Sequence, residues 1–201
     1  MAQRPEYLDL LNAISIGESA AGVYLEAWAN ATCDQELADT LRFVAARETS
    51  HGETFCRRIA ELGFELEHKH DPEAAKRLAR YANPKISDYE KIGPERIDSD
   101  AVKNFFEETE KKIASGYYDE MTCNMMQWYI NEEKDSTKRL RKVYSRIRAE
   151  GKASGMAAGE AGETKAAAAP SADAEAIMAC MTSGFQSLEK TLEKLAKAVA
   201  H

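Results

Sequence analysis

Apolar residues recur every three or four positions along much of the chain, the spacing typical of the buried faces of helices. Two such stripes contain ionisable residues in core positions. The first, within residues 5–31, consists of Leu11, Ile14, Glu18, Ala21, Leu25 and Trp28; the second, within 36–62, consists of Leu37, Leu41, Val44, Glu48, His51, Phe55, Ile59 and Leu62. A carboxylate in an apolar seam is costly unless a proton, a cation or a metal neutralises it. The pattern therefore indicates chemistry inside the core.

The first two predicted helices are expected to pair. The connection between them is short, and Asp34 is a suitable N-cap for the second helix. A connection of this length makes the helices antiparallel neighbours. Glu18 and Glu48 lie at similar distances from the turn, so the two carboxylates should be level. Gly63 suits a left-handed end to the second helix.

The rest of the chain predicts two further long helices and an appendage. Residues 64–97 form a long crossover that includes a short helix opened by Asp71-Pro72. A third helix begins near residues 98–99, and a fourth runs from residue 119 or 122 to 148. The predicted fold is all-α: an antiparallel four-helix bundle with one long crossover over residues 1–150, a flexible linker over 151–173, and an amphipathic helix over 174–201.

A weak internal repeat relates the second and fourth helices. A shift of 85 residues places Glu48 on Glu133 and preserves the apolar stripe, but it places His51 on Ser136. The carboxylate is repeated and the histidine is not. A register built on Glu132 and Asp135 is the alternative; it would put arginines on the stripe, so Glu133 is preferred.

The third helix should offer a carboxylate equivalent to Glu18. Glu110 shares a helix face with apolar neighbours, which favours it. Its separation from Glu133 along the chain, however, is shorter than that of Glu18 from Glu48, and this favours Glu107. Glu108 is a third choice. The prediction is Glu110, with Glu107 and Glu108 left open.

Composition limits the function classes. The chain has 201 residues, 30% charged, with a net charge of −7, which argues against general nucleic-acid binding. No apolar run is long enough to span a bilayer, and the first residues lack the apolar stretch of a signal peptide. Four cysteines without a C-x-x-C pair favour reduced thiols in a cytoplasmic protein. A homodimer is expected for a bundle with additional apolar helix surface.

Glu18, the Glu48-x-x-His51 pair, the long crossover and Glu133 together resemble the ferritin-like superfamily, particularly its rubrerythrin-like branch. The resemblance covers roughly residues 5–148. It implies a four-helix bundle holding two iron ions, or one ion with a weak second site, with manganese as an alternative metal. It also implies oxidoreductase activity on ferrous iron, oxygen or peroxide. The implied ligands are Glu18, Glu48, His51, Glu110 and Glu133. Ser136 and the missing C-x-x-C pairs depart from the pattern.

Two plainer interpretations stand beside this one. Glu48 and His51 could form a buried ion pair, and Glu18 could accept a hydrogen bond from Tyr24, Tyr117 or Tyr129. The alternative function is a metal-free helical bundle that binds a protein partner through residues 174–201.

Overall fold

The chain folds as a set of packed helices. The computed structural model describes residues 3–68, 71–93 and 100–153, and no strand occurs among them. The helices are α1 (Leu8–Ala31), α2 (Gln35–Glu61), α3 (Ala74–Ala82), α4 (Asp88–Ile92), α5 (Asp100–Ala114) and α6 (Glu120–Ala153). Within this described part, no helix has the length and apolar character needed to cross a membrane. The all-α prediction is confirmed.

Some predictions concern residues that the structure does not describe. The expected start of the third helix near residues 98–99 and the C-terminal helix over 174–201 lie outside the described residues. Of the linker predicted over 151–173, only the first three residues are described, and they continue α6 to Ala153.

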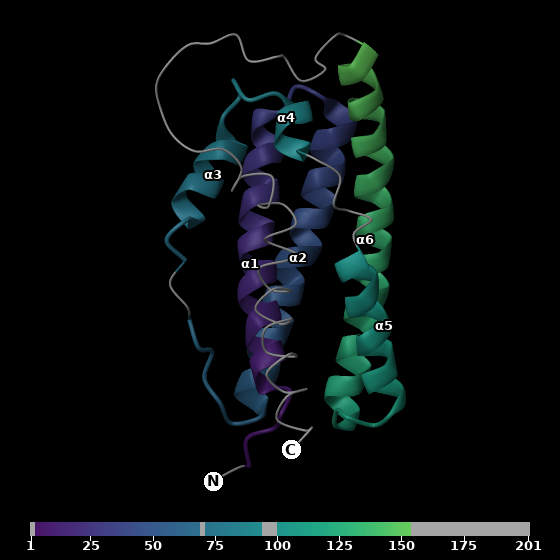
Figure 1. Cartoon of the computed structure of the whole chain (residues 1–201). Coiled ribbons are helices and arrows are strands. Elements are labelled where there is room, and N and C mark those ends of the chain that lie inside the picture. Colours follow the sequence, from purple (N-terminus) through teal and green to yellow (C-terminus); the bar gives the residue numbers. More distant parts are fainter. Residues whose placement is uncertain (1–2, 69–70, 94–99, 154–201) are drawn as a thin grey trace.

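α1 and α2 form the antiparallel hairpin expected from the sequence, and they lie side by side over most of their length (Figure 1). The Asp34 carboxylate accepts a hydrogen bond from the Leu37 N–H at 2.8 Å, so Asp34 caps α2 as predicted. Gly63 has a φ of +84°, and the next N–H, that of Phe64, donates to the Ile59 carbonyl. This left-handed end is also as predicted.

Two glycines allow α1 and α2 to approach closely in the middle of the hairpin. A Cβ on Gly22 would lie 2.4 Å from Thr49 Oγ1, and one on Gly52 would lie 2.2 Å from Ser19 Oγ. The Ser15 hydroxyl donates to the Gly52 carbonyl across the same interface at 2.8 Å. The two backbones therefore approach closely beside Glu18 and His51.

The crossover between α2 and α5 contains two short helices. α3 follows Asp71-Pro72 and packs on α1 (Figure 1). α4 packs on α6. The sequence analysis did not predict α4. Its signal is local: Ser87 and Glu90 form a reciprocal capping box at its start.

α5 and α6 form the second hairpin. Their connection includes Gly116, with a φ of +72°, and ends at Asp119, whose carboxylate accepts the Met121 and Thr122 N–H groups. The sequence left the start of this last helix open between residues 119 and 122, and the structure begins α6 at Glu120, next to the first choice. α5 lies along one end of the longer α6 (Figure 1).

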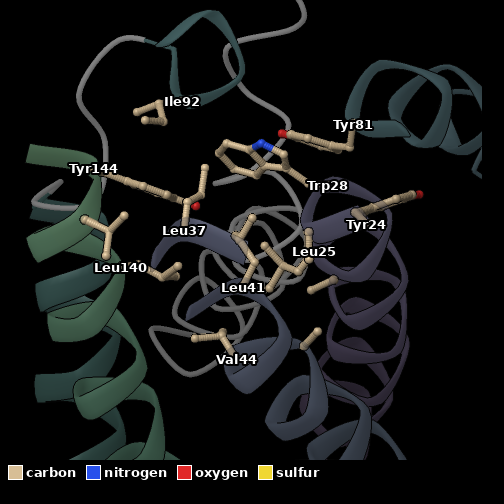
Figure 2. Close-up of a cluster of buried hydrophobic side chains, with 14 of the residues drawn as sticks. Tyr24, Leu25, Trp28, Leu37, Leu41, Val44, Tyr81, Ile92, Leu140 and Tyr144 are labelled. Atoms are coloured by element: carbon tan, nitrogen blue, oxygen red, sulfur yellow. The ribbon is translucent and has the colours of Figure 1, made fainter. Parts of the chain in front are cut away.

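The buried apolar side chains form two separate clusters. One gathers residues near the start of α1 with the end of α2, α5 and the first part of α6, and includes Ile14, Phe55 and Ile130. The other joins the second half of α1 to the start of α2 and the latter part of α6. In this cluster Trp28 lies between the rings of Tyr81 and Tyr144 (Figure 2). On α1, α2 and α6 alike, a buried polar layer separates the two clusters in sequence.

Candidate metal centre

The polar layer brings together four ionisable side chains from three helices. α1 supplies Glu18, α2 supplies Glu48 and His51, and α6 supplies Glu133. One potential ligand atom can be chosen from each residue so that all four atoms lie within 4.8 Å of one another. All four residues are buried. These four residues lie on the same helical stripes as buried apolar residues, so the packing of the apolar side chains also directs the ionisable side chains into the core.

His51 lies at the centre of the group and is fully buried. Its Nδ1 lies 3.5 Å from Glu18 Oε2 and 3.3 Å from Glu133 Oε1. Its Nε2 lies 2.9 Å from Glu132 Oε2. When Nε2 carries the proton and donates it to Glu132, Nδ1 keeps its lone pair facing the other carboxylates. This is how a histidine is oriented toward a metal in many proteins.

Glu18 is held by the tyrosine interaction that the sequence suggested. Tyr129 donates its hydroxyl to Glu18 Oε1 at 2.8 Å, which leaves Glu18 Oε2 facing His51. The rings of Tyr129 and Trp128 contact the His51 ring edge to face. These contacts fix both side chains before any ligand binds.

Several buried polar atoms in this layer lack a hydrogen-bond partner. They are Glu18 Oε2, His51 Nδ1 and both carboxylate oxygens of Glu133. Buried polar atoms are rarely left in this state, and such groups call for an explanation such as an ion. Oxygen and imidazole donors suit a divalent metal of the first transition row. The residues present therefore fit a metal ion held by Glu18, Glu48, His51 and Glu133.

The electrostatics of the four groups are strongly perturbed. Burial, together with the negative charge of Glu18, raises the pKa of Glu133 to about 7. Burial disfavours protonated His51, but Glu133 and Glu18 outweigh it and raise the His51 pKa to about 10. Burial likewise opposes ionisation of Glu18, yet the proximity of Glu48 and His51 and the hydrogen bond from Tyr129 hold its pKa below the usual value. Without a metal, protons must take over part of the neutralising role.

Charged residues of α2 and α6 form the rim of the site. Arg47 donates to Asp135 Oδ2 at 2.7 Å and to Ser136 Oγ at 3.3 Å, and its Nε lies 3.9 Å from Glu132 Oε1. The Glu132 side chain is 29% exposed, whereas Glu133 beside it is fully buried. The inward position on α6 thus belongs to Glu133, in the register that the sequence analysis preferred.

Glu110, the carboxylate predicted from the third helix, is not part of this group. Its side chain is 44% exposed, and Oε1 accepts from Lys134 Nζ at 2.5 Å. Glu107 and Glu108 are also exposed. The buried polar residue of this part of α5 is Thr109. The structure thus brings four of the five predicted ligands together and places Glu110 on the surface of the α5–α6 pair.

Sequence reasoning overlooked two residues at the site: Glu132 as the partner of His51, and Arg47. The internal repeat contained a signal for both, because Arg47 and Glu132 are related by the same shift of 85 residues as Glu48 and Glu133. Opposite charges at two related positions on paired helices favour a contact between them.

Comparison of the chain with protein-family models, with curated proteins and with solved structures found no match.

Proposed function

We propose that this protein is a helical-bundle metalloprotein that binds iron or manganese through Glu18, Glu48, His51 and Glu133 and acts as an oxidoreductase. The observation that carries the proposal is the convergence of four buried ligand atoms, one imidazole nitrogen and three carboxylate oxygens, within 4.8 Å. Three carboxylates in a core are costly without a compensating cation.

The donor set favours a particular class of metal. Carboxylate oxygens suit manganese and ferrous ions, and an imidazole is a common ligand of iron. Structural zinc sites are mostly built from cysteine and histidine, and no cysteine belongs to this group. Iron and manganese both change oxidation state, so a bound ion would supply electron transfer to or from oxygen, peroxide or a ferrous substrate.

The protein's own residues would hold this ion and protect it. Tyr129 fixes Glu18, Glu132 fixes His51, and the two apolar clusters flank the polar layer along the helices. Apolar surroundings limit access of water and strengthen charge interactions within the layer.

The arrangement of the helices supports a ferritin-like bundle as part of this proposal. α1 and α2 form one hairpin, α5 and α6 form another, and the long crossover connects them. In such a bundle, ligands project inward from facing helices.

Metal analysis tests the proposal. Protein produced with iron or manganese and purified anaerobically should retain the metal after desalting, and the Glu48→Ala variant should not. The loaded protein should consume oxygen or peroxide faster than the metal-free protein does. Absence of iron and manganese from the wild-type protein, or equal content in Glu48→Ala, would refute it.

A further inference from the structure

The two hairpins contain an equivalent pair of contacts with different chemistry. The shift of 85 residues relates His51 on α2 to Ser136 on α6, and Arg47 on α2 to Glu132 on α6. The contact between His51 Nε2 and Glu132 Oε2, at 2.9 Å, therefore has a counterpart between Ser136 Oγ and Arg47, at 3.3 Å. The structure contains both contacts, so the two half-sites, one on α2 and one on α6, correspond at these two pairs of positions.

The residue of the partner helix is an anionic acceptor in the first contact and a cationic donor in the second. In the first, a carboxylate accepts from an imidazole and turns its other nitrogen toward the buried ligands. In the second, a guanidinium donates to a serine hydroxyl that is fully buried. Serine supplies no nitrogen ligand, and the arginine is always protonated.

Arg47 is fixed in this place by several acceptors. Its Nη1 donates to Asp135 Oδ2 at 2.7 Å and to the Glu132 carbonyl at 3.4 Å, and its guanidinium stacks 4.4 Å from the Phe43 ring centroid. Arg47 is close enough to Glu133 for its charge to favour the ionised carboxylate. A fixed positive charge beside a shared ligand opposes a second cation there.

Charge balance agrees with one ion. The buried layer holds three carboxylates, so one divalent ion leaves a single negative charge beside the Arg47 guanidinium. A second divalent ion would leave the layer with excess positive charge. Glu132 and Asp135 are 29% and 39% exposed, so solvent screens them more than the buried groups.

We propose that the centre binds a single divalent metal ion, on the His51 side, because Arg47 and Ser136 take the places that a carboxylate and a second histidine would need for a second ion. This inference rests on the proposed function and specifies its metal stoichiometry. Exchange of both residues, in the variant Arg47→Glu/Ser136→His, should give the second half-site the chemistry of the first.

Titration of the full-length protein with Mn²⁺ alone, under anaerobic conditions, tests the stoichiometry. Calorimetry should give one ion per chain, and electron paramagnetic resonance should show the hyperfine sextet of an isolated Mn(II). The double variant should bind two ions per chain with an exchange-coupled spectrum. Ser136→His alone, which retains Arg47, and Ser136→Ala are the matched controls, and both should bind one ion.

The outcomes separate this inference from the proposed function. Two ions of similar affinity in the wild-type protein would overturn the single-ion inference and leave the metal centre intact. Wild-type protein that binds no ion would overturn the metal centre itself, and the inference with it. A folded double variant that still binds one ion would show that Arg47 and Ser136 do not determine the stoichiometry. If that variant does not fold, the stoichiometry and the spectrum of the wild-type protein still show whether one ion or two are bound.

Discussion

The α1–α2 hairpin and the α5–α6 hairpin differ in the side chains that they contribute to the candidate metal centre. The first hairpin contributes two carboxylates and a histidine to the buried layer, and the second contributes Glu133 alone. At the ends of the helices the hairpins remain alike. Asp34 and Asp119 cap α2 and α6, and each also binds an arginine of the other helix, Arg146 and Arg58 respectively. The comparison indicates that the capping contacts of α2 and α6 are repeated while the buried ionisable side chains are not.

The largest expected difference between the hairpins concerns metal affinity. Glu48→Gln removes a buried carboxylate of the first hairpin and should weaken Mn²⁺ binding by more than about 100-fold, because loss of a mere partner of a ligand already costs about 10–100-fold. Glu110→Gln, the matched change in the second hairpin, removes only a surface contact with Lys134 and should leave binding unchanged. Calorimetric titration of both variants measures this. Equal losses would mean that α5 also supplies a ligand.

The metal-free protein should lose stability as the pH rises from about 5 to 8. Folding raises the pKa of Glu133 from 4.5 to about 7. Above pH 4.5 Glu133 therefore ionises more readily in the unfolded chain than in the folded one, which lowers the free energy of unfolding by up to about 3 kcal/mol. The pKa of His51 is raised from 6.5 to about 10, so its contribution is complete below pH 6.5 and decreases as the pH rises toward 10. Both contributions therefore have the same sign.

Thermal unfolding across this pH range measures the effect. Glu133→Gln should flatten the part between pH 5 and 7, whereas Glu110→Gln should keep the wild-type slope. Bound metal should reverse the trend, because ligands must lose protons to bind it and affinity therefore rises with pH. A metal-free protein that gains stability from pH 5 to 8 would contradict the assignment of these protons to the buried layer.

A smaller effect is expected from the residue that orients His51. Glu132→Gln should weaken metal binding by about 10–100-fold, since the amide is a poorer acceptor for Nε2–H than the carboxylate. The equivalent contact in the other half-site involves Ser136, and Ser136→Ala should not change affinity. Dissociation constants for Mn²⁺ compare the two. If both variants bind as tightly as the wild-type protein, Glu132 does not orient a ligand.

The smallest effects should come from the caps, where the hairpins are alike. Asp34→Ala and Asp119→Ala should each lower the free energy of unfolding by about 1 kcal/mol, because each leaves helix N–H groups without an acceptor. Neither change should alter the metal stoichiometry. Urea unfolding measures the loss, and a large loss for one cap only would show that the hairpins differ at their ends as well.

The first hairpin and its buried ionisable residues could be predicted because local pattern determines them. The apolar stripe assigns Glu18, Glu48 and His51 to the buried face. The short connection at Asp34 then determines how far along the hairpin each of them lies. The repeat then assigns Glu133, which is fully buried on α6. These predictions require only helical periodicity and one turn.

The orientation of Glu110 could not be predicted from helical spacing. The residue lies at the level of Glu133, since its partner Lys134 is the next residue along α6, but it lies on the outer face of the helix pair. The inward face of α5 consists of Val102, Phe105, Phe106 and Thr109. Which face of a short helix packs inward depends on the tertiary contacts of α6, and spacing alone does not determine it. The short helix α4 was overlooked for a different reason: five residues are too few for periodicity, and only the capping box indicates it.

Anomalous diffraction would locate a bound ion directly, and the proposed single ion should lie between the four buried side chains. Crystals of protein loaded anaerobically with Fe²⁺ or Mn²⁺ should show one anomalous peak within ligand distance of Glu18, Glu48, His51 and Glu133, and the Glu48→Gln variant should show none. No peak in the wild-type protein, or a peak bounded by other residues, would contradict it.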